Sequence, residues 1–322
     1  MPPENEAATS KPLGNVAAAR VAILMCTKNG AAFIDDQLKS IADQTHENWS
    51  LIVSDDGSDD GTLAKLKGFA AVRPQKITIR KGPEKGVCVN FLSLANDPSI
   101  RADYFAFSDQ DDVWEPDKLR RALACLACVR ADVPGMYCGR TELMGADKQS
   151  YGLSPLFTRL PAFQNALVES LGGGNTMVFN RAAKKILEEA ATLAVVVHDW
   201  WVYQLVSAAG GIVYYDPQPM LKYRQHSDNV IGSDEGWLGR IVSLRPILAG
   251  RFRDWNDANI AALEKLPAHL ITPANREILQ LFMKARRAPL LQRLYFLKKS
   301  GIYRQTLFGN FALSVAAILK KI

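Results

Sequence analysis

Short apolar runs alternate with helical segments through the first 140 residues of the chain. A helix over 31–44 is predicted by apolar residues that recur at helical spacing. Apolar runs of strand length occupy residues 21–27, 50–54, 76–80, 104–108 and 136–139. Strands that are apolar on both faces and alternate with helices are typical of an α/β fold with a mostly parallel central sheet covered on both sides.

The order loosens after residue 140. A glycine-rich segment, 171–180, leads into a strand, and a helix is predicted over 181–192. A further helix opens near Asp199, and GIVYYD and MLKYRQH predict two more strands. From 234 to 322 the pattern predicts only helices, with breaks at Pro246, Pro267, Pro273, Pro289 and Gly301.

Three parts are therefore expected. Residues 1–19 are polar and carry prolines, and they lack the apolar segment of a signal peptide, so we interpret them as a disordered leader. Residues 20–233 form the α/β domain, and residues 234–322 form a basic helical region.

The five cysteines, at 26, 88, 125, 128 and 138, show no regular framework and are expected to be reduced, as in the cytosol. The Cys125–Cys128 pair lacks the further ligands of a zinc site.

Charge is divided unevenly along the chain, whose formal net charge is +6. From Trp237 to the end, 15 Lys and Arg stand against 4 Asp and Glu, a net of +11, so the remainder carries −5. Aromatic residues and leucines lie between these basic residues, which favours a face lying on anionic lipid. The alternative is a packing domain or a homodimer contact with a solvated basic face. The stretch 307–319 is too short to span a bilayer. No nucleic-acid-binding motif accompanies the charge.

The sequence lacks two familiar phosphate-binding motifs. No GxGxxG follows the first predicted strand, and no GxxxxGK[ST] occurs, which argues against a dinucleotide-dependent oxidoreductase and a P-loop nucleotide hydrolase. Acidic turns instead follow the strands, at the edge where sheets of this kind bind ligands. Asp109 and Asp111 can converge on Mg²⁺ or Mn²⁺, or they can form a turn that caps a helix. In DDGS, a carboxylate can accept from a pyrimidine ring or a ribose, or it can form an Asx turn.

The second half of the domain adds other candidates. Asp199 is a general base or a helix N-cap. Trp200 and Trp201 offer flat rings to a sugar, or they belong to the core. His226 could ligate a metal, although lone histidines are more often structural, and Arg224 could hold a phosphate.

The order of these motifs resembles that of a family 2 glycosyltransferase with the GT-A fold. More narrowly, FSDQDDVW, HDWW and YRQHSDNVIG resemble the rhamnosyltransferase-like branch that builds bacterial O-antigen and other surface polysaccharides. The resemblance covers about residues 20–233. It implies that Asp109 and Asp111 are the DxD pair, supported by Asp112, that His226 completes the metal site and that Asp199 is the catalytic base. It places Thr27, Asn29, Asp56 and Asn90 with the donor, and Gly173, Gly174 and Asn175 on the acceptor side. We also expect Asp109 and Arg224 on the donor side and Trp200 and Trp201 on the acceptor side.

The resemblance also implies an activity. An inverting, Mg²⁺- or Mn²⁺-dependent enzyme would move one sugar from a nucleoside diphosphate to a polyprenyl-diphosphate-linked saccharide. L-Rhamnose from dTDP-L-rhamnose is the first expectation for the donor, and UDP-galactose or UDP-GlcNAc is the alternative. The enzyme would be cytoplasmic and peripheral at the inner face of the bacterial inner membrane. A sugar-1-phosphate nucleotidyltransferase would need a basic Gly-rich loop that CTKNGAAF does not supply. A non-catalytic nucleotide-sugar-binding protein would be expected to lack the base or a DxD carboxylate.

Overall fold

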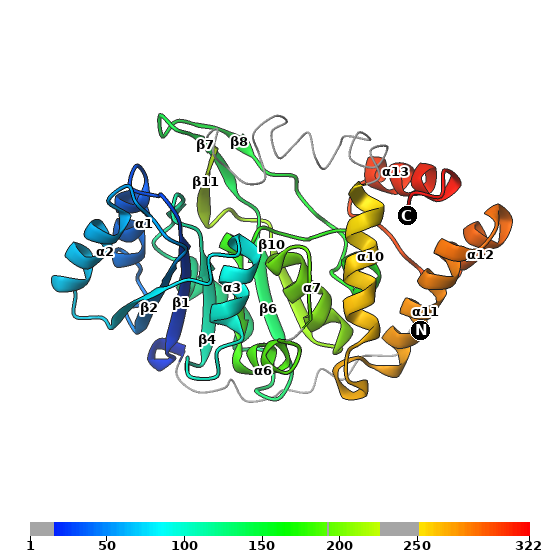
Figure 1. Cartoon of the computed structure of the whole chain (residues 1–322), viewed down its shortest axis with the longest axis horizontal. Coiled ribbons are helices and arrows are strands. Elements are labelled where there is room, and N and C mark those ends of the chain that lie inside the picture. The colour runs from blue at the N-terminus through cyan, green and yellow to red at the C-terminus, as the bar shows by residue number, and fades with distance from the viewer. Residues whose placement is uncertain (1–15, 192, 226–250) are drawn as a thin grey trace, which may run out of the picture.

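A seven-stranded sheet forms the centre of the molecule (Figure 1). The structure is a computed structural model, and it describes residues 16–191, 193–225 and 251–322. Its strand order is β10-β6-β9-β4-β1-β2-β3. The strands are β1 (Val21–Thr27), β2 (Trp49–Asp55), β3 (Ile77–Lys81), β4 (Tyr104–Ser108), β6 (Gly135–Gly139), β9 (Val178–Asn180) and β10 (Ile212–Asp216). Strand β9 runs antiparallel to both neighbours, and the other pairings are parallel. The predicted α/β class and mostly parallel sheet are confirmed.

Strand β1 shows why the first apolar runs form central strands. All seven of its residues are buried, because helices cover both faces of the sheet. Thr27 at its end pairs in register with Asp55 at the end of β2. Strand β4, on the other side of β1, ends with Ser108 opposite Met25. The polar turns after these strands therefore meet at one edge.

Helices cover the two faces of the sheet (Figure 1). Apolar side chains of α1 (Ile34–Ala42), α2 (Thr62–Ala71) and α4 (Lys118–Leu126) belong to one apolar cluster. Those of α3 (Val87–Ala95), α6 (Arg181–Glu189) and α7 (His198–Ala208) belong to the other. The helices predicted in these regions are present, with ends shifted by a few residues.

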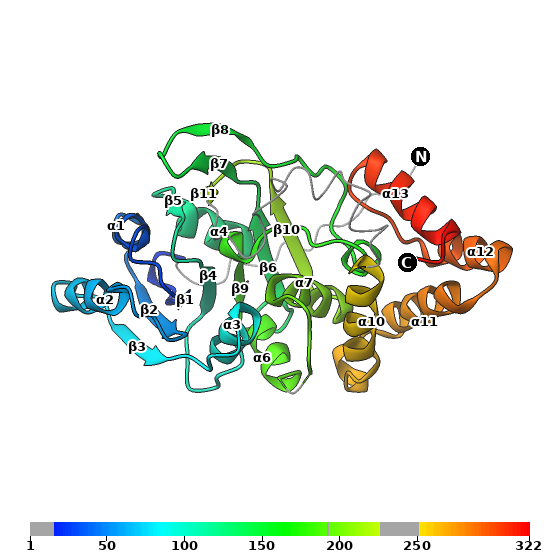
Figure 2. The same ribbon diagram turned by 45° about the horizontal axis from the view of Figure 1, so that its top comes forward.

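A second, four-stranded sheet stands over the end of the main one (Figure 2). It has the order β5-β11-β7-β8, with β5 (Val113–Trp114), β11 (Leu221–Gln225), β7 (Glu142–Gly145) and β8 (Ser150–Leu153). Strand β11 was predicted and the other three were not. Strand β5 has only two residues and every residue of β8 is exposed, so neither carries the apolar pattern that identifies a strand.

The C-terminal region is helical in its described part. It comprises α10 (Arg251–Glu264), a 3-10 turn (Ala268–Leu270), α11 (Pro273–Arg287), α12 (Leu290–Ser300) and α13 (Leu307–Ile318). The breaks predicted at Pro267, Pro273, Pro289 and Gly301 separate these elements, whereas Pro246 lies outside the described residues. Thr272 caps α11 by accepting from the amide of Asn275, and Gly301 ends α12 with φ 68°. No helix in the described ranges has both the length and the apolar character needed to cross a membrane.

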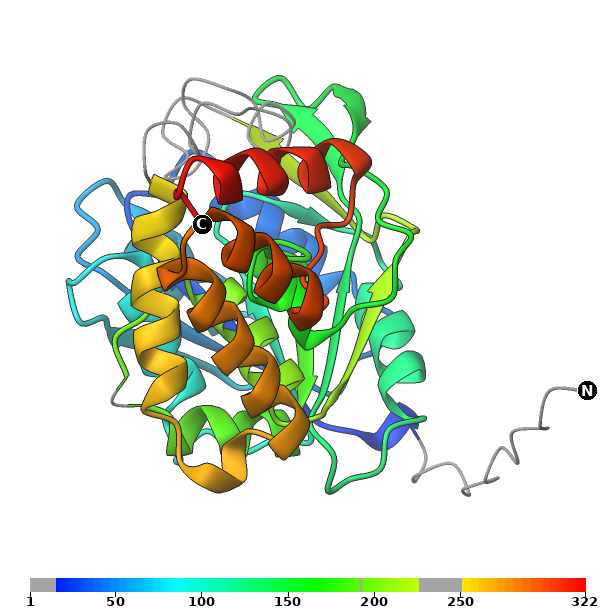
Figure 3. The same cartoon turned by 90° about the vertical axis from the view of Figure 1, so that its right-hand side faces the viewer.

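These helices pack on the α/β domain (Figure 3). Leu263 of α10, Phe282 of α11 and Leu313 of α13 belong to the same apolar cluster as α7. At the other end of the chain, Val16–Ala18 form a 3-10 turn, and Val16 packs on the second cluster. The expectation of disorder is therefore wrong for these three residues, because the apolar contact of Val16 and the hydrogen bond from Asn48 to the Ala18 carbonyl hold the turn in place. Residues 1–15 lie outside the description.

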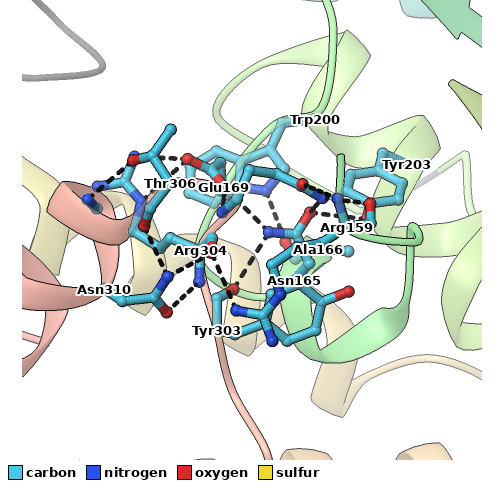
Figure 4. A network of polar contacts seen from close by, with 12 residues as sticks. Arg159, Asn165, Ala166, Glu169, Trp200, Tyr203, Tyr303, Arg304, Thr306 and Asn310 are labelled. Carbon is cyan, nitrogen blue, oxygen red and sulfur yellow. Dashed lines mark hydrogen bonds and ion pairs between the residues drawn. The ribbon is translucent and has the colours of Figure 1, made fainter. Parts of the chain in front are cut away.

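A polar network fastens the linker between α12 and α13 to the segment around α5 (Phe163–Ala166) (Figure 4). The buried carboxylate of Glu169 accepts from the amide of Gln305 at 2.7 Å and from Nδ2 of Asn165 at 3.0 Å. Arg304 donates to the same carboxylate through Nε and Nη2. The C-terminal helices are thus held to the domain by polar contacts as well as by apolar packing.

Candidate functional site

A cavity of about 770 Å³ opens at the carboxyl edge of the main sheet. Segments that are far apart in the sequence line it together. The predicted residues among its lining are Thr27, Asn29, Asp56, Asn90, Asp109, Asp111, Gly173, Gly174, Asn175 and Asp199. The fold therefore brings ten of the predicted site residues to one place.

Asp55 organises the turn after β2. Its carboxylate accepts from the hydroxyl of Thr27 at 2.7 Å and from the hydroxyl and amide of Ser58 at 2.6 and 2.9 Å. Burial raises the pKa of Asp55, but the hydrogen bonds from Ser58 and Thr27 outweigh it and hold the pKa below its ordinary value. The same turn also contacts Asn29, whose φ is 48°, because the Asn29 amide donates to the Ser58 hydroxyl. Asp55 was not singled out from the sequence, although the Asp-Asp doublet contained the signal.

Asp56 faces the cavity from the same turn. Its carboxylate is buried and accepts from the amides of Glu84 at 2.7 Å and Gly86 at 3.2 Å, just before α3 begins. Asn90 on α3 donates to the carbonyl of Ser54, while its Oδ1 has no hydrogen-bond partner within the described protein. That buried acceptor beside the cavity is suited to a ligand N–H or O–H.

The acidic loop after β4 is pinned by its middle residue. Gln110 accepts from the amide of Lys28 and donates to the carbonyl of Lys28, both at 2.9 Å. A Cβ on Gly30 would lie 2.3 Å from Oε1 of Gln110, so the glycine leaves room for this contact. The loop that carries Asp109 and Asp111 is therefore joined to the loop that carries Asn29.

Negative charge is concentrated around Asp109. Burial, together with the charges of Asp111 and Asp199, raises the pKa of Asp109 to about 8, against the opposing effect of Lys118. Lys118 is itself buried, with Nζ 3.5 Å from the ring centroid of Trp114, and burial lowers its pKa to about 7. The donor set of carboxylate oxygens fits a hard divalent cation, which would supply the missing positive charge.

Asp112 joins the acidic loop to two other segments. Its fully buried carboxylate accepts from Nδ2 of Asn175 at 2.6 Å and from the amide of Arg224 at 3.2 Å. Burial, with the charges of Asp111 and Asp109, raises its pKa well above the ordinary value. Asp112 thus supports the site from behind the cavity wall.

Arg224 corrects a prediction. Its side chain is fully buried and is not part of the cavity lining. Nε donates to the carbonyl of Asp111 at 2.8 Å, and Nη2 donates to Asp36 at 2.9 Å on α1. The guanidinium therefore holds the acidic loop to α1 and does not reach a donor phosphate.

Asp199 lies in the first turn of α7, where Val197 occupies the N-cap position. Its carboxylate accepts from the amides of Gly174 and Trp200. Burial raises the pKa of Asp199 to about 6, although these two hydrogen bonds partly offset it. A carboxylate of this basicity at a cavity wall can accept a proton near neutral pH.

The glycine-rich loop sits against a residue that sequence reasoning did not single out. His198 lines the cavity and stacks on Phe91, with ring centroids 4.2 Å apart, and burial lowers its pKa to about 3. A Cβ on Gly174 would lie 2.4 Å from its Nε2. The glycine is thus required for the close approach of the loop to α7.

The two tryptophans also differ from expectation. Trp200 and Trp201 are 5% and 2% exposed, and neither lines the cavity. Nε1 of Trp200 donates to the carbonyl of Ala166 at 2.7 Å, and Trp201 belongs to the apolar core. They shape α7 from within and do not offer a sugar platform.

His226 lies outside the described residues, so its predicted place at the metal is a prediction still. Within residues 16–191, 193–225 and 251–322, no three His, Cys, Asp or Glu side chains gather closely enough to hold a metal ion. Cys125 and Cys128 have free thiols and belong to no such group.

Comparison with known proteins gives the family. The model of glycosyl transferase family 2 matches residues 22–187, and the chain belongs to this family of enzymes. The dTDP-rhamnosyl transferase RfbG of Shigella flexneri is 32% identical over 65% of this chain and 74% of that protein. The UDP-Glc:alpha-D-GlcNAc-diphosphoundecaprenol beta-1,3-glucosyltransferase WfgD of Escherichia coli is 32% identical, over 38% of this chain and 46% of its own length.

Solved structures show the same fold. The mannosyltransferase PcManGT from Pyrobaculum calidifontis, in complex with GDP-Man and Mn²⁺, aligns with a TM-score of 0.52 at 15% identity, over 94% of this chain and 86% of that one. The protein is therefore a GT-A glycosyltransferase of family 2.

Proposed function

We propose that the protein is an inverting, metal-dependent glycosyltransferase that transfers L-rhamnose from dTDP-L-rhamnose to a lipid-linked saccharide. The observation that carries the proposal is the convergence, in one cavity, of the Asp109–Asp111 pair, the half-buried carboxylate of Asp199 and a glycine-rich loop. Rhamnose is favoured by the Shigella flexneri relative, which is similar over 74% of its length. UDP-galactose and UDP-GlcNAc are the alternative donors.

The nucleotide would bind between the turns after β1 and β2. Asp56 and the unpartnered Oδ1 of Asn90 provide acceptors for the base or ribose there. Asn29 lines the same wall. This assignment follows from the exposure of these side chains to the cavity and from the absence of basic phosphate loops elsewhere in the sequence.

Asp109 and Asp111 would hold Mg²⁺ or Mn²⁺, with His226 as a third ligand. When bound, the cation offsets the negative charge that grows on the departing diphosphate. The support is the Asp109–Asp111 pair at the cavity wall, where burial and the charges of Asp111 and Asp199 raise the pKa of Asp109 to about 8. A cation bound between these carboxylates would offset the repulsion between their negative charges.

Asp199 would remove the proton from the acceptor hydroxyl as that oxygen attacks the anomeric carbon. The sugar–phosphate bond breaks as the new bond forms, and attack from the opposite face inverts the centre. The backbone amide of Gly174 orients the carboxylate at 3.1 Å. A general base of this kind typically contributes ~10²–10⁴-fold to the rate.

The acceptor side is the loop of Gly173, Gly174 and Asn175. A polyprenyl-diphosphate-linked saccharide is the class of acceptor in the name of the Escherichia coli relative, which acts on a diphosphoundecaprenol-linked sugar. Such an acceptor would place the enzyme at the inner face of the bacterial membrane, as a peripheral protein that adds one sugar.

A donor panel would test this function. Purified full-length protein is incubated with a lipid-linked saccharide and with each of dTDP-L-rhamnose, UDP-galactose and UDP-GlcNAc, with and without EDTA. Transfer of rhamnose that stops in EDTA and returns with Mn²⁺ is expected. Transfer from a UDP-sugar alone would change the donor, and turnover indifferent to EDTA would remove the metal.

A further inference from the structure

Helix α13 is apolar on both of its sides. Residues 307–319 contain no charged side chain. One side, with Ala312, Leu313, Ala316 and Ala317, is buried against the rest of the protein. The opposite side is open to solvent, with Leu307 92% and Phe311 60% exposed, and Phe308, Ile318 and Leu319 complete the stripe. Among the residues that the structure describes, nothing fully covers this side of the helix.

Helix α12 continues the exposed stripe. Leu291 is 82% and Tyr295 60% exposed, and Leu290 and Leu294 lie beside them at helical spacing. Buried Arg293 joins the two helices, because its Nη1 donates to the carbonyl of Ala317 at 2.7 Å. The two helices lie next to each other on one side of the molecule (Figure 3). We call this surface the α12–α13 face.

Basic residues lie at the C-terminal ends of both helices of the α12–α13 face. Lys298 and Lys299 end α12 and are exposed, and Lys320 and Lys321 follow α13. Between residue 278 and residue 322 the sequence has nine Lys and Arg and no Asp or Glu. An apolar stripe with basic ends is the combination that binds at the surface of an anionic bilayer, where leucine and aromatic side chains enter the acyl boundary and lysines remain among the headgroups.

The same charge disfavours a second copy of the chain as the occupant. A symmetric dimer through the α12–α13 face would place two wholly basic segments against each other, and like charges across an interface are unfavourable. An anionic lipid surface complements both the charge and the apolar stripe. A helix of 12 residues lies along such a surface, since it is too short to cross it.

We propose that the α12–α13 face docks the protein on an anionic lipid bilayer, with α13 lying in the plane of the headgroups. This inference names the surface that would contact the membrane, and of the proposed function it rests only on the membrane location. It is independent of the donor, the metal and the base, because none of the residues of this face lines the catalytic cavity.

Vesicle sedimentation of the intact protein tests the proposal. One set of vesicles contains phosphatidylglycerol and phosphatidylethanolamine, and the other contains phosphatidylcholine alone. The variant Leu307→Asn/Phe311→Asn removes apolar area from the stripe, and Lys320→Glu/Lys321→Glu reverses the rim. The matched controls are Lys67→Glu on α2 and Val72→Asn just after it, both at exposed positions remote from this face.

Binding of the wild type and both controls to anionic vesicles alone is expected, weakened by 0.5 M NaCl. Each α12–α13 variant should bind ~10-fold or more weakly, with unchanged melting temperature and unchanged transfer to a soluble saccharide acceptor. Equal binding of variants and wild type, or no binding by the wild type, would overturn the proposal. A wild-type dimer that the Leu307→Asn/Phe311→Asn variant dissociates would overturn it too, by assigning the face to a second copy. Since transfer to the soluble acceptor is measured separately, loss of docking and loss of catalysis are distinguishable.

Discussion

The carboxylate of Glu169 lies 3.1 Å from Nη2 of Arg304, and both side chains are almost fully buried. Glu169 precedes the glycine-rich loop by a few residues, and Arg304 lies in the linker between α12 and α13. The pair thus joins the C-terminal helices to the segment that leads into the glycine-rich loop of the cavity (Figure 4).

Glu169→Gln should destabilise the protein by about 3 kcal/mol, because removal of one charge leaves its buried partner uncompensated. Chemical denaturation followed by circular dichroism measures this free energy of unfolding. The matched control is Asp132→Asn, which removes an ion pair with Arg130 whose side chains are 66% and 72% exposed. No measurable change is expected there. Equal effects of the two substitutions would contradict a structural role for Glu169.

Asp199→Asn should lower kcat by ~10²–10⁴-fold and leave donor affinity within about twofold, because the amide keeps the shape of the side chain but cannot take a proton. Transfer assays and calorimetric titration with dTDP-L-rhamnose measure the two quantities. Asp59→Asn, an exposed substitution outside the cavity lining, serves as control. Transfer by the Asp199→Asn variant close to that of the wild type would exclude Asp199 as the base.

The pH profile should report the same carboxylate. Burial raises the pKa of Asp199 to about 6, and the base must be ionised to act. We therefore expect kcat/KM to be halved near pH 6 and to fall about tenfold per pH unit below it. The residual activity of Asp199→Asn should lack this limb. A wild-type profile flat down to pH 5 would show that the acting base has an ordinary pKa.

The contribution of Asp199 to the free energy of unfolding should fall as the pH rises, whereas the activity should rise. Since the folded-state pKa of Asp199 is raised, the stabilisation from its protonated form is complete below the unfolded-state pKa and is lost as the pH rises through about 6. Asp199→Asn cannot ionise, so it should be more stable than the wild type at pH 8, and the gap should narrow towards pH 4. Melting temperatures across this range measure it. A variant less stable than the wild type at pH 8 would mean that the charged carboxylate is stabilising.

Gly30→Ala and Gln110→Ala should act as one change. A Cβ at position 30 would displace the Gln110 side chain, and either substitution breaks its two hydrogen bonds to Lys28. Loss of about 1 kcal/mol in binding, or roughly fivefold in Kd for thymidine diphosphate, is expected from each. The double variant should be no weaker than either single one.

Gly68→Ala is the control for this cycle, because nothing lies within 4 Å of a Cβ there. It should leave the Kd unchanged. Additive losses in the double variant would show that Gly30 and Gln110 contribute to binding separately.

The turns of the site could be predicted because strand ends in a parallel sheet share an edge. Apolar runs such as 21–27 and 104–108 are long enough to define their own ends, and the residues after them had to meet. Thr27, Asp56 and Asp109 could be placed together for this reason. The small sheet could not, since β5 and β7 pair with the distant β11, and β5 and the exposed β8 carry little apolar pattern of their own.

Side-chain direction was the part that sequence could not supply. Trp200 and Trp201 adjoin Asp199, yet one turn of helix directs them into the core while Asp199 faces the cavity. Arg224 and His198 show the same limit, because burial under other segments decided that the arginine supports the acidic loop and that the histidine reaches the cavity. Such outcomes depend on tertiary packing, which no local pattern records.

The bridge through Asp112 has a consequence for the exchange of parts between related enzymes. Its one carboxylate holds Asn175 of the glycine-rich loop and the backbone of Arg224. A foreign glycine-rich loop grafted here without a matching amide at position 175 would leave a buried oxygen unsatisfied in the acidic loop. Chimeras that fold correctly should therefore take residues 109–112 and residues 172–175 from the same parent enzyme.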